Sequence, residues 1–310
     1  MERKAFGDMI VKELAKKYGD EVTIEFREVQ KINHKALGIT AQKKNNVVSP
    51  VIYLEEYFQE LIKGKNIMDI VTAISSIIEC IHPDPRKCYA ELQDYEWIKP
   101  KLRLKVINRE KNRELLCEVP HKGILDLSVI PYIVLDHRGE MSCLIRQTML
   151  DMWKTSFEEL FAQAEDNMNQ MVPPSIQKMS DFMMEMLLDT SGDSDDIESD
   201  ELLQMLKGES SIPATEKEMF IISNKEKLNG AYAVFYKDLL KNLAQSLNAD
   251  GLFILPSSIH ETLVVSGKGM NAADLRGMVQ DVNQTTVSEG EYLSDNVYYY
   301  DLNSEEIRIA

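Results

Sequence analysis

The sequence lacks the marks of several large protein classes. Its four cysteines, at positions 80, 88, 117 and 143, form no CxxC pair, which argues for reduced thiols and against a disulfide scaffold or a standard zinc site. The 14 glycines include no GxxxxGKS/T or GxGxxG spacing, so no phosphate-binding loop is indicated. No apolar run approaches the roughly 20 residues that span a bilayer, and the charged N-terminus shows no signal peptide. We expect a cytoplasmic protein with no cofactor, no metal ion and no membrane segment.

Basic residues are scarce in the second half of the chain. Residues 1–150 hold 24 lysines and arginines against 22 acids, whereas residues 151–310 hold 11 against 29. The net charge of −16 therefore arises in the second half, and because it repels phosphates we expect no nucleic-acid partner. One basic stretch, Lys99, Lys101, Arg103 and Lys105, alternates with apolar residues. We interpret it as the solvated face of a half-buried strand.

Short stretches with strand or helix periodicity follow one another in both halves, which predicts the α+β class. Residues 189–201 carry seven acids, no base and a single large apolar side chain, Ile197. Such a stretch buries too little apolar surface to offset its ordering entropy, and we interpret residues 189–215 as an acidic flexible linker. The chain is thereby divided into two mixed modules, residues 1–188 and 216–310, each with short antiparallel strands and amphipathic helices.

Periodicity also places the individual elements. A stripe of apolar residues from Phe6 to Tyr18 predicts a helix that ends at Gly19, followed by a three-stranded antiparallel meander. The remaining expected helices lie at residues 67–81, 156–167, 179–187, 237–247 and 271–283. The expected strands lie at residues 22–26, 37–41, 47–54, 102–107, 124–135, 141–145, 219–222, 231–236, 252–255 and 260–265, with a closing hairpin at 297–310.

Two of these helices share a start signal. Ser156 and Glu159 are spaced as a capping box, and Asn271 and Asp274 occupy the same offsets before a leucine. The coincidence fits an internal duplication, but it also fits two ordinary helix starts, because this pattern is common.

The segment after the strand 252–255 is the most suggestive for chemistry. Pro256 is followed by Ser257, Ser258, His260 and Glu261, so that two hydroxyls, an imidazole and a carboxylate follow a buried strand. Histidine is a general base at neutral pH and serine a nucleophile when imidazole reaches it. However, no GxSxG motif is present, and Val264 rules out HExxH. We favour a structural role, in which the serines bond the backbone of a bend and His260 bonds a neighbour.

Methionines are concentrated before the acidic stretch. Six lie between positions 168 and 186, at 168, 171, 179, 183, 184 and 186. A methionine stripe at helical spacing usually packs in a core, but flexible methionine surfaces also bind varied partners.

Four segments together resemble a known family. They are SPVIYL at residues 49–54, NREKNRELLCEVPH at 108–121, ILPSSIHE at 254–261 and LSDNVYYYD at 293–301. In this order they resemble domain-of-unknown-function family 5688 of anaerobic Gram-positive gut bacteria. The resemblance implies a bacterial cytoplasmic protein with one architecture for the family, and it implies no catalytic residue.

Two functional hypotheses remain open. The first is a non-enzymatic cytoplasmic interaction or regulatory protein that binds a protein partner through the methionine-rich helix or the acidic linker. The alternative is an enzyme or small-molecule binder that uses Ser257, Ser258, His260 and Glu261.

Overall fold

The computed structural model describes residues 2–44, 51–80, 90–135, 142–190, 218–256 and 258–310. The predicted α+β class is confirmed, since helices accompany three antiparallel sheets. The chain forms two compact units. Unit 1 comprises Met1–Pro100 with Asp151–Lys154, and unit 2 comprises Lys101–Leu150 with Thr155–Ala310.

Unit 1 is built on a three-stranded meander, as predicted. Its strands, in order, are β1 (Val22–Gln30), β2 (Lys35–Lys43) and β3 (Val51–Tyr53). The main helices are α1 (Arg3–Tyr18), α2 (Glu55–Ile62) and α3 (Ile67–Cys80). Shorter elements are η1 (Gly19–Glu21), α5 (Tyr95–Ile98) and η2 (Lys99–Lys101), and α7 (Gln147–Trp153) ends in this unit.

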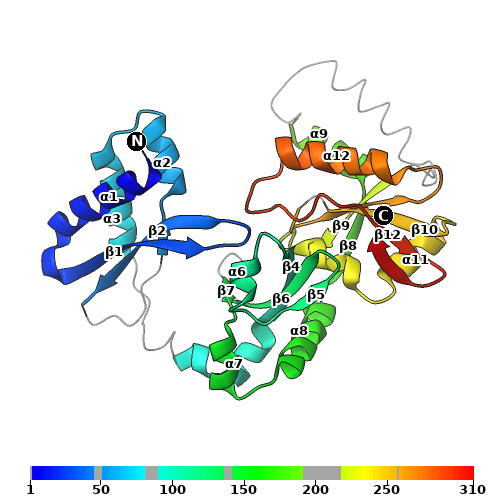
Figure 1. Cartoon of the computed structure of the whole chain (residues 1–310), viewed down its shortest axis with the longest axis horizontal. Helices are drawn as coiled ribbons and strands as arrows, with labels where there is room; N and C mark the ends of the chain where they lie inside the picture. The colour runs from blue at the N-terminus through cyan, green and yellow to red at the C-terminus, as the bar shows by residue number, and fades with distance from the viewer. Residues whose placement is uncertain (1, 45–50, 81–89, 136–141, 191–217, 257) are drawn as a thin grey trace. The chain divides into compact units, whose positions relative to one another are not determined.

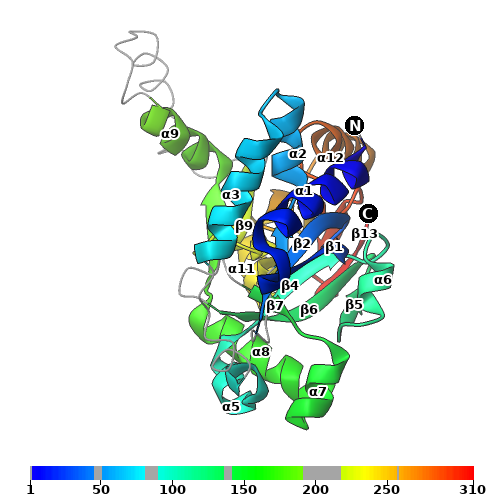
Figure 2. The ribbon, with the colours of Figure 1, turned by 90° about the vertical axis from the view of Figure 1, so that its left-hand side faces the viewer.

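The core of unit 1 explains why α1 lies on the meander. Apolar residues of α1, among them Phe6 and Ile10, form one buried cluster with Ile39 of β2 and Ile74 of α3. Figure 2 shows α1 in front of β1 and β2. The helix ends at Gly19, whose positive φ of 52° suits glycine, as the sequence predicted.

Unit 2 contains two sheets. Sheet B consists of β4 (Leu102–Asn108), β5 (Lys122–Ile124), β6 (Leu127–Val134) and β7 (Ser142–Leu144), with β6 paired to the other three. Sheet C has the order β13-β12-β10-β11-β9-β8. Its strands are β8 (Pro174–Lys178), β9 (Met219–Asn224), β10 (Gly251–Leu255), β11 (Thr262–Ser266), β12 (Tyr298–Asp301) and β13 (Glu306–Ile309).

The helices of unit 2 cover these sheets. They are α6 (Arg113–Leu116), α8 (Phe157–Met171), α9 (Met179–Thr190), η4 (Gly230–Phe235), α11 (Leu239–Ser246) and α12 (Ala272–Thr285). Helix α8 packs on β4, and α12 forms a core cluster with side chains of β10 and β11. Figure 1 shows α9 and α12 on one side of sheet C and α11 on the other.

Pairing in sheet C also determines which face α9 occupies. Gln177 of β8 lies opposite Ile221 of β9, which lies opposite Leu263 of β11. Leu263 packs in the cluster beneath α12, and the amide of Gln177 donates to Glu185 of α9 at 2.9 Å. Because paired residues share a face, α9 and α12 cover the same face of the sheet.

The division of the chain differs from the predicted modules 1–188 and 216–310. Strand β8 precedes the acidic stretch, and yet it pairs with β9, which follows that stretch. Both strands therefore belong to unit 2, whose main boundary lies at Pro100. Residues 189 and 190 end α9, and the rest of the predicted linker 189–215 lies outside the described residues. Pairing between distant strands carries no local compositional signal, which is why the sequence did not indicate it.

Two local predictions are wrong. Residues 231–236, predicted as a strand, lie mostly in the 3-10 helix η4. A Cβ at Gly230 would come within 2.2 Å of Ser223 Oγ, so glycine allows this turn to press against β9. Arg103 and Lys105 do not lie on a solvated face, because β4 is buried along its whole length and contacts both α8 and η4.

Candidate functional site

The segment Pro256–Glu261 connects β10 to β11 in a tight turn. Ser257 lies outside the described residues. The backbone N–H of Ser258 donates to Glu261 O at 3.2 Å, and the backbone N–H of His260 donates to Ser258 Oγ at 3.0 Å. The Ser258 hydroxyl thus accepts from its own turn, which is the arrangement expected of a structural serine.

His260 is bonded on both its backbone and its ring. Its carbonyl accepts from Ser223 Oγ at 2.8 Å, and its Nδ1 accepts from the backbone N–H of Asn229 at 3.1 Å. In the neutral ring the proton therefore lies on Nε2, 3.7 Å from Glu291 Oε1. Asn229 has a left-handed backbone, with φ of 52°, and it begins the turn into η4. His260 thus joins the β10–β11 turn to the turn after β9.

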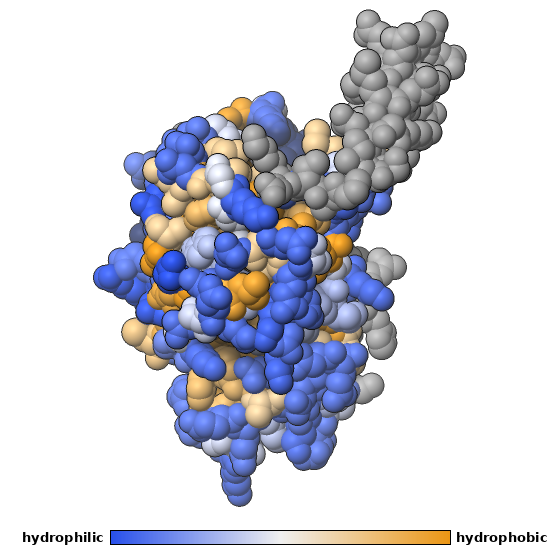
Figure 3. All heavy atoms as spheres, turned by 90° about the vertical axis from the view of Figure 1, so that its right-hand side faces the viewer, coloured by the Kyte–Doolittle hydropathy of each residue, from blue (hydrophilic) through white to orange (hydrophobic). Residues whose placement is uncertain are grey.

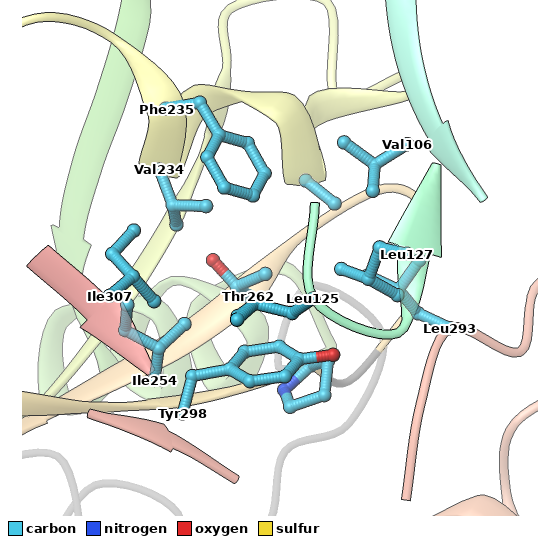
Figure 4. Close-up of a pocket in the computed structure, with 12 residues that line it drawn as sticks. Val106, Leu125, Leu127, Val234, Phe235, Ile254, Thr262, Leu293, Tyr298 and Ile307 are labelled. Carbon is cyan, nitrogen blue, oxygen red and sulfur yellow. The ribbon is translucent and has the colours of Figure 1, made fainter. Parts of the chain in front are cut away.

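A small cavity lies beside this turn (Figure 4). Its volume is about 10 Å³, and it is lined almost entirely by apolar side chains of sheet B, η4 and sheet C, with Pro256 at its wall. Thr262 Oγ1 is buried there without a hydrogen-bond partner in the described part of the chain. Such a volume holds about one water molecule. Ser258, His260 and Glu261 are not among the residues that line it, and it has no room for a substrate.

A carboxylate that the sequence did not single out organises the polar contacts nearby. Asp126, in the β5–β6 turn, accepts from Ser294 Oγ at 2.6 Å, from the side-chain amide of Asn296 at 3.0 Å and from Tyr298 OH at 2.8 Å. Burial, and then the charge of Asp126, raise the pKa of Tyr298, which keeps its hydroxyl protonated as a donor. Asn108 adds a bond from its side-chain amide to Leu293 O at 2.9 Å.

These contacts give a structural role to two of the four segments on which the family resemblance rests. Segment 108–121 supplies Asn108, and segment 293–301 supplies Ser294, Asn296 and Tyr298. They meet around Asp126 and join sheet B to sheet C. The only signal in the sequence was the presence of these segments in the resemblance, because Asp126 itself lies in an ordinary turn.

Unit 1 contains a wide, open depression of about 510 Å³. Two of its charged residues, Lys31 and Glu55, have partners within the unit. Glu55 accepts from the backbone N–H of Leu37 at 2.5 Å, and Lys31 Nζ lies 3.3 Å from the centre of the Tyr53 ring. Burial, and then the charge of Glu55, raise the pKa of Tyr53, so its phenol stays protonated at neutral pH.

The methionine-rich region divides into buried and exposed side chains. Met168 of α8 is 3% exposed and packs in the core. Met183 and Met186 of α9 are 55% and 58% exposed. On the same face of sheet C, Met278 of α12 is 52% exposed and Val282 44%. Core packing therefore accounts for only part of the methionine stripe.

A groove runs beside α12 on this face. It has a volume of about 90 Å³ and a floor formed by Leu255, Leu263 and Met219, and Met278 and Val282 form its helical wall. We call it the α12 groove; Val279 and Asn283 complete its lining. Figure 3 shows apolar patches within a largely hydrophilic surface on the side of the molecule at the right of Figure 1.

Acidic side chains border the α12 groove. Asp274 and Asp281 are exposed on α12, one turn before Met278 and just beyond it. Helices α9 and α12 together carry five acids and one base, Arg276. The guanidinium of Arg276 donates to the carbonyl oxygen of Ala310 at 2.5 Å, so its charge is directed toward the chain's own C-terminal residue.

In the described part of the chain no three His, Cys, Asp or Glu side chains are grouped to hold a metal ion. Among the described helices, none combines the length and apolar character needed to cross a bilayer.

The fold and these sites define an α+β protein in which side-chain hydrogen bonds around Asp126 link two antiparallel sheets. A family model described as a family of unknown function, DUF5688, matches residues 3–302, and the chain belongs to this family. No curated protein and no solved structure is detectably similar to it.

Proposed function

We propose that this chain is a binding protein that recognises a protein partner through apolar side chains exposed on α9 and α12. The observation that carries the proposal is the exposure of Met183, Met186, Met278 and Val282 on one face of sheet C. Exposed apolar surface that is gathered on one face is typical of an interaction site. Methionine suits such a site because its flexible thioether adapts to the partner.

The polar groups around His260 and Asp126 support the same proposal indirectly. Their hydrogen bonds hold the β10–β11 turn and the β5–β6 turn in place, and the cavity beside them is too small for a substrate. Cys117 and Cys143 are free thiols, which suits a reducing compartment, and we place the function in the cytoplasm.

Photo-cross-linking tests this function directly. The chain is produced with photo-methionine in place of methionine, mixed with an extract of the cells that naturally make it, and irradiated. We expect cross-links to another protein at Met183, Met186 and Met278. Met171 of α8 is the control, because it is equally exposed, at 52%, but lies on a different helix. Cross-links that are as frequent at Met171, or that are absent at the other three, would contradict the proposed function.

A further inference from the structure

We propose that the α12 groove binds a basic amphipathic helix of a partner protein. This inference rests on the proposed function and adds the chemistry of the partner. The groove offers an apolar lining, and its border offers negative charge.

The apolar lining matches the spacing of a helix face. Met278 and Val282 are four residues apart on α12, so they lie about 6 Å apart along its axis. Leu255 and Leu263 form a floor from two neighbouring strands. Apolar side chains at positions i, i+3, i+4 and i+7 of a bound helix would lie at similar intervals, as in other helix-in-groove complexes.

The negative charge at the border of the groove favours a partner helix whose polar face carries basic residues. Asp274 and Asp281 are seven residues apart, which is about two turns, so both project from the same side of α12. That side adjoins Met278, which lies between them in the sequence. Lysines or arginines that flank the apolar face of a bound helix would meet these carboxylates.

The same charges disfavour other occupants. An acidic peptide, a nucleic acid and an anionic lipid surface are repelled by the acids of α9 and α12. A second copy of this chain bound through the same face would bring two acidic surfaces together. A basic amphipathic helix complements both the apolar lining of the groove and the acidic residues at its border.

Three synthetic peptides test the proposal on the full-length chain. The first is a fluorescent helical peptide of leucine and lysine with leucines at i, i+3, i+4 and i+7. The second replaces each lysine with glutamate, and the third scrambles the leucines so that no apolar face forms. In fluorescence anisotropy we expect the first to bind at least about tenfold more tightly than the others. Its affinity should fall as salt rises, because screening weakens exposed charge pairs.

Variants of the chain locate the binding. Met278→Gln with Val282→Gln should weaken the first peptide at least about tenfold, the range of a hot-spot loss. Met171→Gln, the control at an equally exposed methionine of α8, should leave binding unchanged. Asp274→Asn with Asp281→Asn should weaken binding about threefold and flatten its salt dependence. Their control is Glu158→Gln with Asp166→Asn, two exposed acids of α8. Circular dichroism verifies that every variant is folded.

The outcomes separate this inference from the proposed function. Equal binding of the lysine and glutamate peptides, or binding that ignores the groove variants, would overturn the basic-helix proposal. If photo-cross-links still formed at Met278, the binding function would survive with a partner of other chemistry. Cross-links at Met278 to a second copy of the chain would instead identify a self-association surface and overturn the proposal.

Discussion

Helices α8 and α12 both begin with a polar N-cap side chain but differ in how much of their apolar surface is covered. Ser156 forms a full capping box at the start of α8, and the Asn271 side chain accepts from the backbone N–H of Ala273 at the start of α12. Helix α8 buries five residues, including Leu160 and Met168, whereas α12 buries only Leu275 and Val279. The fold thus needs one narrow stripe of α12, and the adjoining apolar side chains are free to serve binding.

The largest loss of stability is expected at the buried leucine that each of the two helices packs against a sheet. Leu160 is 0% exposed and Leu275 is 2% exposed, and each anchors its helix on a sheet. Leu160→Ala and Leu275→Ala should each lower the free energy of unfolding by about 2–5 kcal/mol, because each leaves a cavity. Urea denaturation measures this loss. A loss below about 1 kcal/mol for either variant would show that its helix is not anchored as described.

A second prediction concerns the strand that α8 covers. Lys105 is 6% exposed, and its burial lowers its pKa to about 8. Below pH 8 the Lys105 ammonium is charged in both the folded and the unfolded chain. Its burial in the folded chain removes water from that charge, which lowers the free energy of unfolding. Between pH 8 and about 10.5 the folded state loses the proton first, so the contribution of Lys105 becomes less unfavourable as pH rises.

Replacing Lys105 tests whether its buried charge destabilises the folded chain at neutral pH. Lys105→Met should raise the free energy of unfolding at pH 7 by up to ~3 kcal/mol, and the gain should shrink as pH rises and disappear above about pH 11, where the lysine is neutral in both states. Part of the gain is offset, because Lys105 Nζ lies 4.7 Å from the centre of the Tyr132 ring and that contact is lost. Lys111→Met is the control, since Lys111 is exposed and also lies over a tyrosine ring. A variant that is less stable at pH 7 would contradict the argument.

The wrong prediction for Arg103 and Lys105 shows that the sequence pattern predicts a strand but not the burial of its polar face. Alternating polar and apolar residues correctly predicted the strand, but alternation does not reveal whether the polar face is covered. Helix starts were predictable because Ser156 and Asn271 act on backbone groups within three residues. The pairing of β8 with β9 and the contacts of Asp126 were not, because they join residues far apart in the chain.

The binding site at Ser257, Ser258, His260 and Glu261 stays a prediction, and His260 gives the sharpest test of it. His260→Ala removes the acceptor for the Asn229 N–H and should lower the free energy of unfolding by about 1–2 kcal/mol. His260→Asn is the matched control, because its side-chain oxygen can take the place of Nδ1 and should preserve most of the stability. Thermal or urea unfolding distinguishes the two variants. Equal stability of wild type and both variants would favour a functional imidazole.

The smallest change in the free energy of unfolding is expected at the exposed apolar side chains of α12. Met278 and Val282 are about half exposed, and glutamine is a good helix former, so Met278→Gln and Val282→Gln should each change the free energy of unfolding by no more than about 0.5 kcal/mol. Val279→Gln is the contrast, since Val279 is 5% exposed and a buried amide without a partner costs about 1–3 kcal/mol. Urea denaturation compares the three. If Met278→Gln were as costly as Val279→Gln, the side chain would be part of the core of unit 2. The difference between α8 and α12 would then reflect packing, and the α12 groove would lose the wall that a partner helix needs.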